Sequence, residues 1–158
     1  MMRRVIDLVA EPRGTLYFQL LHALALQSST LLMVVRDGLG LNSTGEALLA
    51  NLQPYFQEKK RGLSWPGTTL IGEEATIYRF TLSREVVDVL VAFTDGLFQW
   101  QQPMLPEDLA FLRDDGTAIL ASICHEEDAY LDVTEEEYQR LSAIPAMKEI
   151  LRLRNEDQ

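Results

Sequence analysis

The chain has 158 residues, 47% of them hydrophobic, and a formal net charge of −10. This length and composition predict one globular domain spanning residues 1–158, large enough to bury a full core. The excess of acid argues against nucleic acid and anionic membranes as partners, because both are bound through clustered lysine and arginine.

The only cysteine, Cys124, cannot form an internal disulfide, which favours a reducing compartment. The apolar run after the N-terminal arginines is too short for a signal peptide. Polar residues interrupt the most apolar window, residues 15–35, whereas a membrane span needs about 20 predominantly apolar residues. We therefore expect a cytoplasmic protein without membrane association.

The first elements in the chain alternate between strand and helix. Residues 4–9 predict a strand, and residues 15–27 carry leucines at helical spacing. The short apolar run 30–35 predicts a buried strand. Ser43 followed by Glu46 has the pattern of a capping box at the start of the next helix.

Pro54 should end that helix, because it lacks the backbone N–H that would continue the hydrogen-bonding pattern. The charged segment 58–62 then predicts a solvated exit. Two strands are expected at 65–71 and 75–81. After them, Ser83 predicts the N-cap of a helix whose apolar positions continue as far as Trp100.

The last third of the chain predicts a three-stranded meander. Segments 109–113 and 117–125 flank an Asp-Asp-Gly sequence, a strong hairpin signal, and segment 129–133 supplies the third strand. A second capping box, Thr134 with Glu137, begins another helix.

A final helix is expected from about Pro145. The predicted elements together give an α+β fold with a mainly antiparallel sheet, a C-terminal three-strand meander and about five helices.

Acidic residues are concentrated between residues 107 and 137, where eleven acids face one basic residue, Arg113. Turns and helix starts explain many of them, since acids favour both places. Successive turns of a meander lie at opposite ends of its strands, so these acids do not all form one surface. The predicted interaction patch has His125 at its rim and consists of Glu107, Asp108, Glu126, Glu127 and Asp128.

The glycine-rich loop between the second strand and the second helix does not match a phosphate-binding pattern. Gly40 and Gly45 have the spacing of a phosphate loop, but Glu46 stands where that loop requires lysine, and a carboxylate repels phosphate. The loop is therefore predicted to be a flexible turn, and no cofactor is expected.

Cys124 and His125 are adjacent, and neighbours on a strand point to opposite faces, so they do not form a catalytic dyad. Cys124 is predicted to be a small core residue. The chain has two histidines and no H-E-x-x-H pattern, so no metal site is predicted from a motif. Carboxylates near His125 leave binding of Ca²⁺ or Mg²⁺ open as an alternative.

Two segments carry a resemblance. "WPGTTLIGEEATIYRF" (65–80) and "LPEDLAFLRDDGTAILASICHEEDAYL" (105–131) resemble small bacterial proteins of unknown function with WPGT, LPEDLxFxRxDG and SxxHExDAxL elements. The resemblance covers about the second half of the chain and implies that His125 and Glu126 belong to the shared shape. In size and charge the chain more loosely resembles acidic toxin-immunity proteins, an analogy without a shared motif.

Three functional hypotheses follow. The first is a non-enzymatic interaction protein that binds a basic protein partner, such as a toxin, through the acidic patch. The second is a small enzyme or a ligand- or metal-binding domain with a site around His125 and the neighbouring carboxylates. The third is a homodimer with Trp65 or Trp100 at its interface.

Overall fold

The computed structural model describes residues 2–154. Its four α-helices are α1 (Gly14–Ala25), α2 (Ser43–Leu52), α3 (Arg84–Phe93) and α4 (Glu135–Ser142). Four short 3₁₀ helices are η1 (Gln53–Tyr55), η2 (Leu97–Gln99), η3 (Cys124–Glu126) and η4 (Met147–Ile150). The strands are β1 (Arg3–Leu8), β2 (Thr30–Arg36), β3 (Phe56–Gly62), β4 (Ser64–Trp65), β5 (Thr68–Thr69), β6 (Ala75–Thr81), β7 (Glu107–Leu112), β8 (Ala118–Ile123), β9 (Asp128–Thr134) and β10 (Leu151–Leu153).

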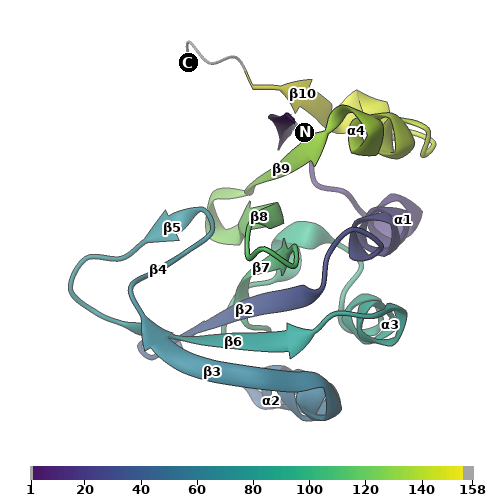
Figure 1. Cartoon of the computed structure of the whole chain (residues 1–158). Coiled ribbons are helices and arrows are strands. Elements are labelled where there is room, and N and C mark those ends of the chain that lie inside the picture. Colours follow the sequence, from purple (N-terminus) through teal and green to yellow (C-terminus); the bar gives the residue numbers. More distant parts are fainter. Residues whose placement is uncertain (1, 155–158) are drawn as a thin grey trace.

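Eight of the strands form one sheet in the order β10-β1-β9-β8-β7-β2-β6-β3, and every pairing within the described part of the chain is antiparallel. The predicted α+β class and the β7–β8–β9 meander are confirmed, with four α-helices in place of the expected five. Figure 1 shows the strands stacked from β10 at the top to β3 at the bottom, with the small β4–β5 hairpin to one side.

The sheet has a core on each face, and the alternation of side chains along β2 shows why. Leu31 and Met33 pack into a large cluster with the apolar faces of all four α-helices. Leu32 and Val34 point the other way, into a smaller cluster with Trp65 of the β4–β5 hairpin. Because neighbouring residues of a strand point to opposite faces, a continuous apolar run is what a strand buried on both sides requires.

The helix expected to run from Ser83 to Trp100 is shorter than predicted. Ser83 is the N-cap and accepts a hydrogen bond from the Val86 N–H, as expected. The helix ends at Phe93, because Thr94 and Gly96 adopt extended backbone conformations. Glu11 then holds the following segment by accepting a hydrogen bond from the Phe98 N–H at 2.7 Å.

Other local predictions need correction. Asn42, not Ser43, caps α2, because its side chain accepts hydrogen bonds from the two N–H groups of Thr44 and Gly45. Residues 58–62 are largely solvent-exposed, as expected, but they form part of the edge strand β3 rather than an irregular exit from the helix. Instead of the expected strand 65–71, the chain forms a small hairpin of two strands, β4 and β5, with two residues each.

The C-terminal end also differs, because the final helix is the single 3₁₀ turn η4 and is followed by β10, which pairs with β1. The capping box of Thr134 and Glu137 at the start of α4 is confirmed. Across residues 2–154, the structure contains no helix with the length and apolar character required to cross a membrane.

Candidate functional site

A bulge at the start of β7 determines how its two acids are placed. Glu107 pairs with Val34 of β2, but Ala110 pairs with Leu32, so β7 has an extra residue at this point. Asp108 takes up the irregularity with a φ of +54°. Aspartate adopts this left-handed conformation more readily than most residues other than glycine. The bulge leaves both carboxylates buried inside the protein.

The Asp108 carboxylate is fully buried and held by two hydrogen bonds. Its Oδ2 accepts from the Trp65 indole N–H at 3.0 Å, and its Oδ1 accepts from the backbone N–H of Cys124 at 3.1 Å. An Arg36 guanidinium nitrogen lies 4.0 Å from Oδ2. The negative charge of Asp108 is thus met by two donors and one neighbouring cation.

Glu107 has fewer interactions. It is only 4% exposed, and its Oε1 accepts a hydrogen bond from the backbone N–H of Gln102 at 3.1 Å. Its Oε2 is buried and has no hydrogen-bond partner among the described residues. Burial is the main cause that raises the pKa of Glu107 above the ordinary glutamate value. Since Arg36 offsets one of the two neighbouring carboxylates, an ionised Glu107 leaves one negative charge uncompensated.

His125 brings a nitrogen ligand to the same place. It lies in η3, the turn between β8 and β9, and its side chain is 45% exposed. One ligand atom from each of Glu107, Asp108 and His125 lies within 4.8 Å of the other two. Two ligands of one ion, at bond lengths of about 2.0–2.6 Å, lie within roughly 4–5 Å of each other. We call these three residues the carboxylate–histidine group.

The β4–β5 hairpin closes over this group from one side. The Arg36 guanidinium carbon lies over the Trp65 ring, 5.4 Å from its centroid. Gly67 has a φ of +91°, and a Cβ at this position would lie 2.9 Å from Ile123 Cδ1, so only glycine allows the hairpin to approach β8 this closely. Sequence reasoning missed Arg36 and assigned Trp65 to a homodimer interface. The expectation that Trp65 and Trp100 are exposed is wrong, because both are buried within the chain.

Cys124 is a core residue, as predicted. It is fully buried, and burial raises the pKa of its thiol to about 12. Its Sγ lies 3.4 Å from the Leu97 carbonyl oxygen. A nucleophilic cysteine requires a thiolate, which this environment disfavours.

The predicted acidic patch does not form one continuous surface. Glu126 and Glu127 are exposed and Asp128 is half-buried, all near the β8–β9 turn. Glu107 and Asp108 lie inside the protein, so they belong to the carboxylate–histidine group and do not contact a macromolecular partner directly. The structure therefore separates the six predicted residues into a buried pair and an exposed turn, with His125 between them.

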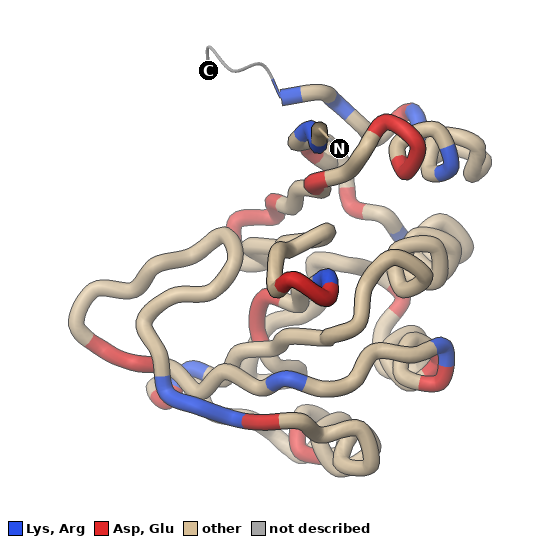
Figure 2. Tube along the Cα trace, in the orientation of Figure 1, with Lys and Arg blue, Asp and Glu red and all other residues tan. Residues whose placement is uncertain are grey.

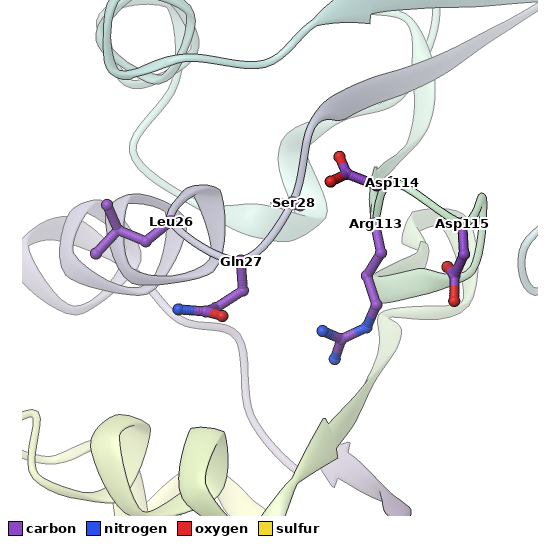
Figure 3. Close-up of a pocket in the computed structure, with 6 residues that line it drawn as sticks. All are labelled: Leu26, Gln27, Ser28, Arg113, Asp114 and Asp115. Atoms are coloured by element: carbon purple, nitrogen blue, oxygen red, sulfur yellow. The ribbon is translucent and has the colours of Figure 1, made fainter. Parts of the chain in front are cut away.

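Two other candidate features have structural explanations. The Gln102 side chain donates to the carbonyl oxygens of Arg36 and Gly40 and thereby fixes the glycine-containing loop before α2. An open depression of about 410 Å³ lies where the loop after α1 meets the β7–β8 turn. Figure 3 shows the carboxylates of Asp114 and Asp115 there pointing in different directions. The Arg113 guanidinium beside this depression already donates to Glu137, so it is not available to a ligand.

A scan against protein-family models finds no match, and comparisons with curated proteins and with solved structures find none either.

Proposed function

We propose that the protein binds a divalent metal cation through Glu107, Asp108 and His125. The observation that carries the proposal is the Glu107 Oε2 atom, which is buried without a hydrogen-bond partner among the described residues, in the residue group that also supplies an aspartate oxygen and a histidine nitrogen. Leaving a buried polar atom unpaired costs about 1–3 kcal/mol, and more for a charged group. A bound cation removes this cost.

The ligand types favour a first-row transition ion over Ca²⁺ or Mg²⁺. Histidine nitrogen is a common ligand of Zn²⁺ and related ions, whereas Ca²⁺ and Mg²⁺ prefer oxygen. Three protein ligands leave at least one coordination position for water or a small ligand. The half-exposed His125 ring provides the side from which such an ion enters and exchanges.

The test is calorimetric titration of the purified chain with Zn²⁺, Mn²⁺ and Ca²⁺ in turn. We expect saturable binding of one transition ion per chain, weakened at least tenfold in Glu107→Gln and in His125→Ala. The matched control is Glu136→Gln, which removes an exposed carboxylate in α4. Absence of binding in the wild type, or an equal loss in the control, contradicts the proposal.

Recognition of a basic protein partner is a second candidate function, and the exposed β8–β9 turn favours it. Glu126 and Glu127 are solvent-exposed, and neither forms an ion pair with a lysine or arginine among residues 2–154. Exposed acids of this kind speed association with a basic surface, an effect that salt screens over about 8 Å at physiological ionic strength. A cytoplasmic toxin or another basic protein fits this description.

Capture at low salt tests the second candidate. Wild-type chain and a triple variant, Glu126→Lys with Glu127→Lys and Asp128→Lys, are used as bait, and the captured protein is then purified and titrated against both. A basic partner should bind the wild type at least tenfold more tightly, with affinity that falls as salt rises. Equal affinity for both baits, or no change with salt, contradicts this candidate.

A further inference from the structure

The edge strand β3 is unusual in this acidic protein because its exposed surface is basic. β3 pairs with β6 on one side only, and it ends the order of the eight-stranded sheet. Six of its seven residues are exposed, and the seventh is half-exposed. Figure 2 shows its basic residues as a continuous blue stretch along the edge of the sheet. An edge strand of this length carries unpaired backbone N–H and C=O groups, which another strand can pair with.

Two of the three lysines in the chain, Lys59 and Lys60, account for the uncompensated charge on this edge. The neighbouring charges are neutralised within the structure: Arg79 donates to Glu58 at 3.1 Å, and Arg61 donates to Asp37. Among residues 2–154, neither lysine has an ion-pair partner. The edge therefore presents two free positive charges, one toward each face of the sheet.

An apolar groove runs beside the same edge. It has a volume of about 600 Å³ and lies between α2 and the β3–β6 pair, with Leu49, Phe56, Lys59 and Tyr78 among its lining residues. Phe56 is 39% exposed, an unusual position for a large aromatic side chain. A strand added to β3 would cover this side chain and the groove with every second residue of its own.

We propose that β3 is a docking edge for an extended acidic segment of another protein, which pairs its backbone with β3 and places its carboxylates near Lys59 and Lys60. Addition of a strand to a free edge obtains affinity from main-chain hydrogen bonds and specificity from alternate side chains. Charge complementarity identifies the occupant, because the two free lysines attract carboxylates. The same lysines disfavour pairing of β3 with a second copy of itself. This inference is independent of the cation site.

The probe is a nine-residue peptide in which pairs of valines alternate with pairs of glutamates, so that glutamates lie on both faces of the added strand. It carries a fluorescent label on one blocked end and is titrated by fluorescence anisotropy at low salt. Wild-type chain should bind it, and Lys59→Glu with Lys60→Glu should weaken binding at least tenfold. The matched control is Lys148→Glu with Arg152→Glu, which reverses two exposed positive charges in η4 and β10 and should bind as the wild type does. A peptide with lysine in place of glutamate should not bind.

Backbone pairing is tested with two peptides of the same sequence that are N-methylated at alternate residues, one pattern for each edge of the peptide. Methylation of the edge that faces β3 removes its donors, so one pattern should abolish binding. Equal binding of both methylated peptides, or no binding of the unmethylated one, overturns the proposal. Sedimentation that shows a dimer abolished by Lys59→Glu with Lys60→Glu also overturns it, since the occupant is then a second copy.

Discussion

A buried carboxylate site lies near each end of β7, and the two sites are built differently. Arg113, the residue that follows β7, donates to both carboxylate oxygens of Glu137 at 2.8 Å. One of these oxygens also accepts from the Thr134 N–H at 2.8 Å. At the first residue of β7, Glu107 has one oxygen bound to a backbone N–H and the other unpaired among the described residues.

The difference separates a structural ion pair from a candidate binding site. Glu137 is matched by a cation, and both of its oxygens accept hydrogen bonds, so it connects the β7–β8 turn, β9 and α4 with no carboxylate oxygen left unpaired. The carboxylate–histidine group has two carboxylates for one nearby arginine and a half-exposed histidine beside them. A buried acid that is fully paired stabilises the fold, whereas an incompletely paired one has capacity for a cation.

The greatest loss of stability should follow from breaking the ion pair of Arg113 and Glu137. Arg113→Met keeps the length of the side chain but leaves the Glu137 carboxylate buried without its cation. We expect a loss of about 3–5 kcal/mol in the free energy of unfolding, measured by urea denaturation. Arg113→Lys is the matched control, because it keeps the charge but cannot donate to both oxygens at once, and it should lose less. Equal losses in the two variants would mean that charge pairing contributes little.

Loss of the Glu137 charge should lower stability by a smaller amount than loss of Arg113, and this amount should depend on pH. Arg113 lowers the pKa of Glu137 to about 2, below its ordinary value of 4.5. A carboxylate with a lowered folded pKa contributes stability that is present above the unfolded pKa and is lost as pH falls toward the folded pKa. Glu137→Gln, which retains the capping oxygen, should therefore cost about 1.5–3 kcal/mol at pH 7.

The difference between wild type and Glu137→Gln should shrink as pH falls from about 4.5 toward 2. Thermal unfolding of both proteins across this range measures it. A difference that stays constant with pH would show that the carboxylate charge does not act through Arg113.

The surroundings of Glu137 were predictable in part, because some of its partners are close to it in the sequence. Thr134 and Glu137 are three residues apart, and the capping-box pattern requires nothing from elsewhere in the chain. Ser83 and the Asp-Asp-Gly turn were identified for the same reason. The pairing with Arg113 was not predicted, because it joins residues 24 positions apart.

The carboxylate–histidine group was predicted as a set of residues but not as a buried site. Charged residues are rarely buried, so Glu107 and Asp108 were assigned to the surface. The apolar residues around them, Leu105 and the run 109–112, were the available signal of burial. The contact of Asp108 with Trp65 spans 43 residues and depends on the tertiary fold.

The edge strand β3 was missed for another physical reason. A strand exposed on both faces has no alternation of apolar and polar residues, so its charged sequence resembles a loop.

Within the carboxylate–histidine group, the hydrogen bond from Trp65 to Asp108 should contribute to the stability of the fold. Trp65→Phe removes the indole N–H that donates to Oδ2 and should cost about 1.5 kcal/mol, the low end for hydrogen bonds to charged groups, since the Cys124 N–H and Arg36 remain. Trp100→Phe is the control, because the buried indole of Trp100 donates to the neutral Tyr17 hydroxyl. Urea denaturation should show a larger loss for Trp65→Phe, and the reverse order would mean that Asp108 does not depend on this donor.

The smallest predicted change in stability is that of Glu107→Gln, which should leave the fold unchanged or stabilise it. Glu107→Gln makes the same change as Glu137→Gln, but it removes a buried charge that has no cation of its own. In metal-free buffer we expect this variant to match the wild type or exceed it by up to about 1 kcal/mol, because desolvation of the carboxylate no longer opposes folding.

The order of stability should then reverse with a saturating transition ion. A ligand at a hundred times its dissociation constant stabilises the wild type by about 2.7 kcal/mol, whereas a variant that does not bind it gains nothing. Thermal unfolding with chelator and with Zn²⁺ measures both conditions. If Glu107→Gln destabilises the metal-free chain as much as Glu137→Gln does, then Glu107 is a structural residue like Glu137, and the distinction between the two ends of β7 is wrong.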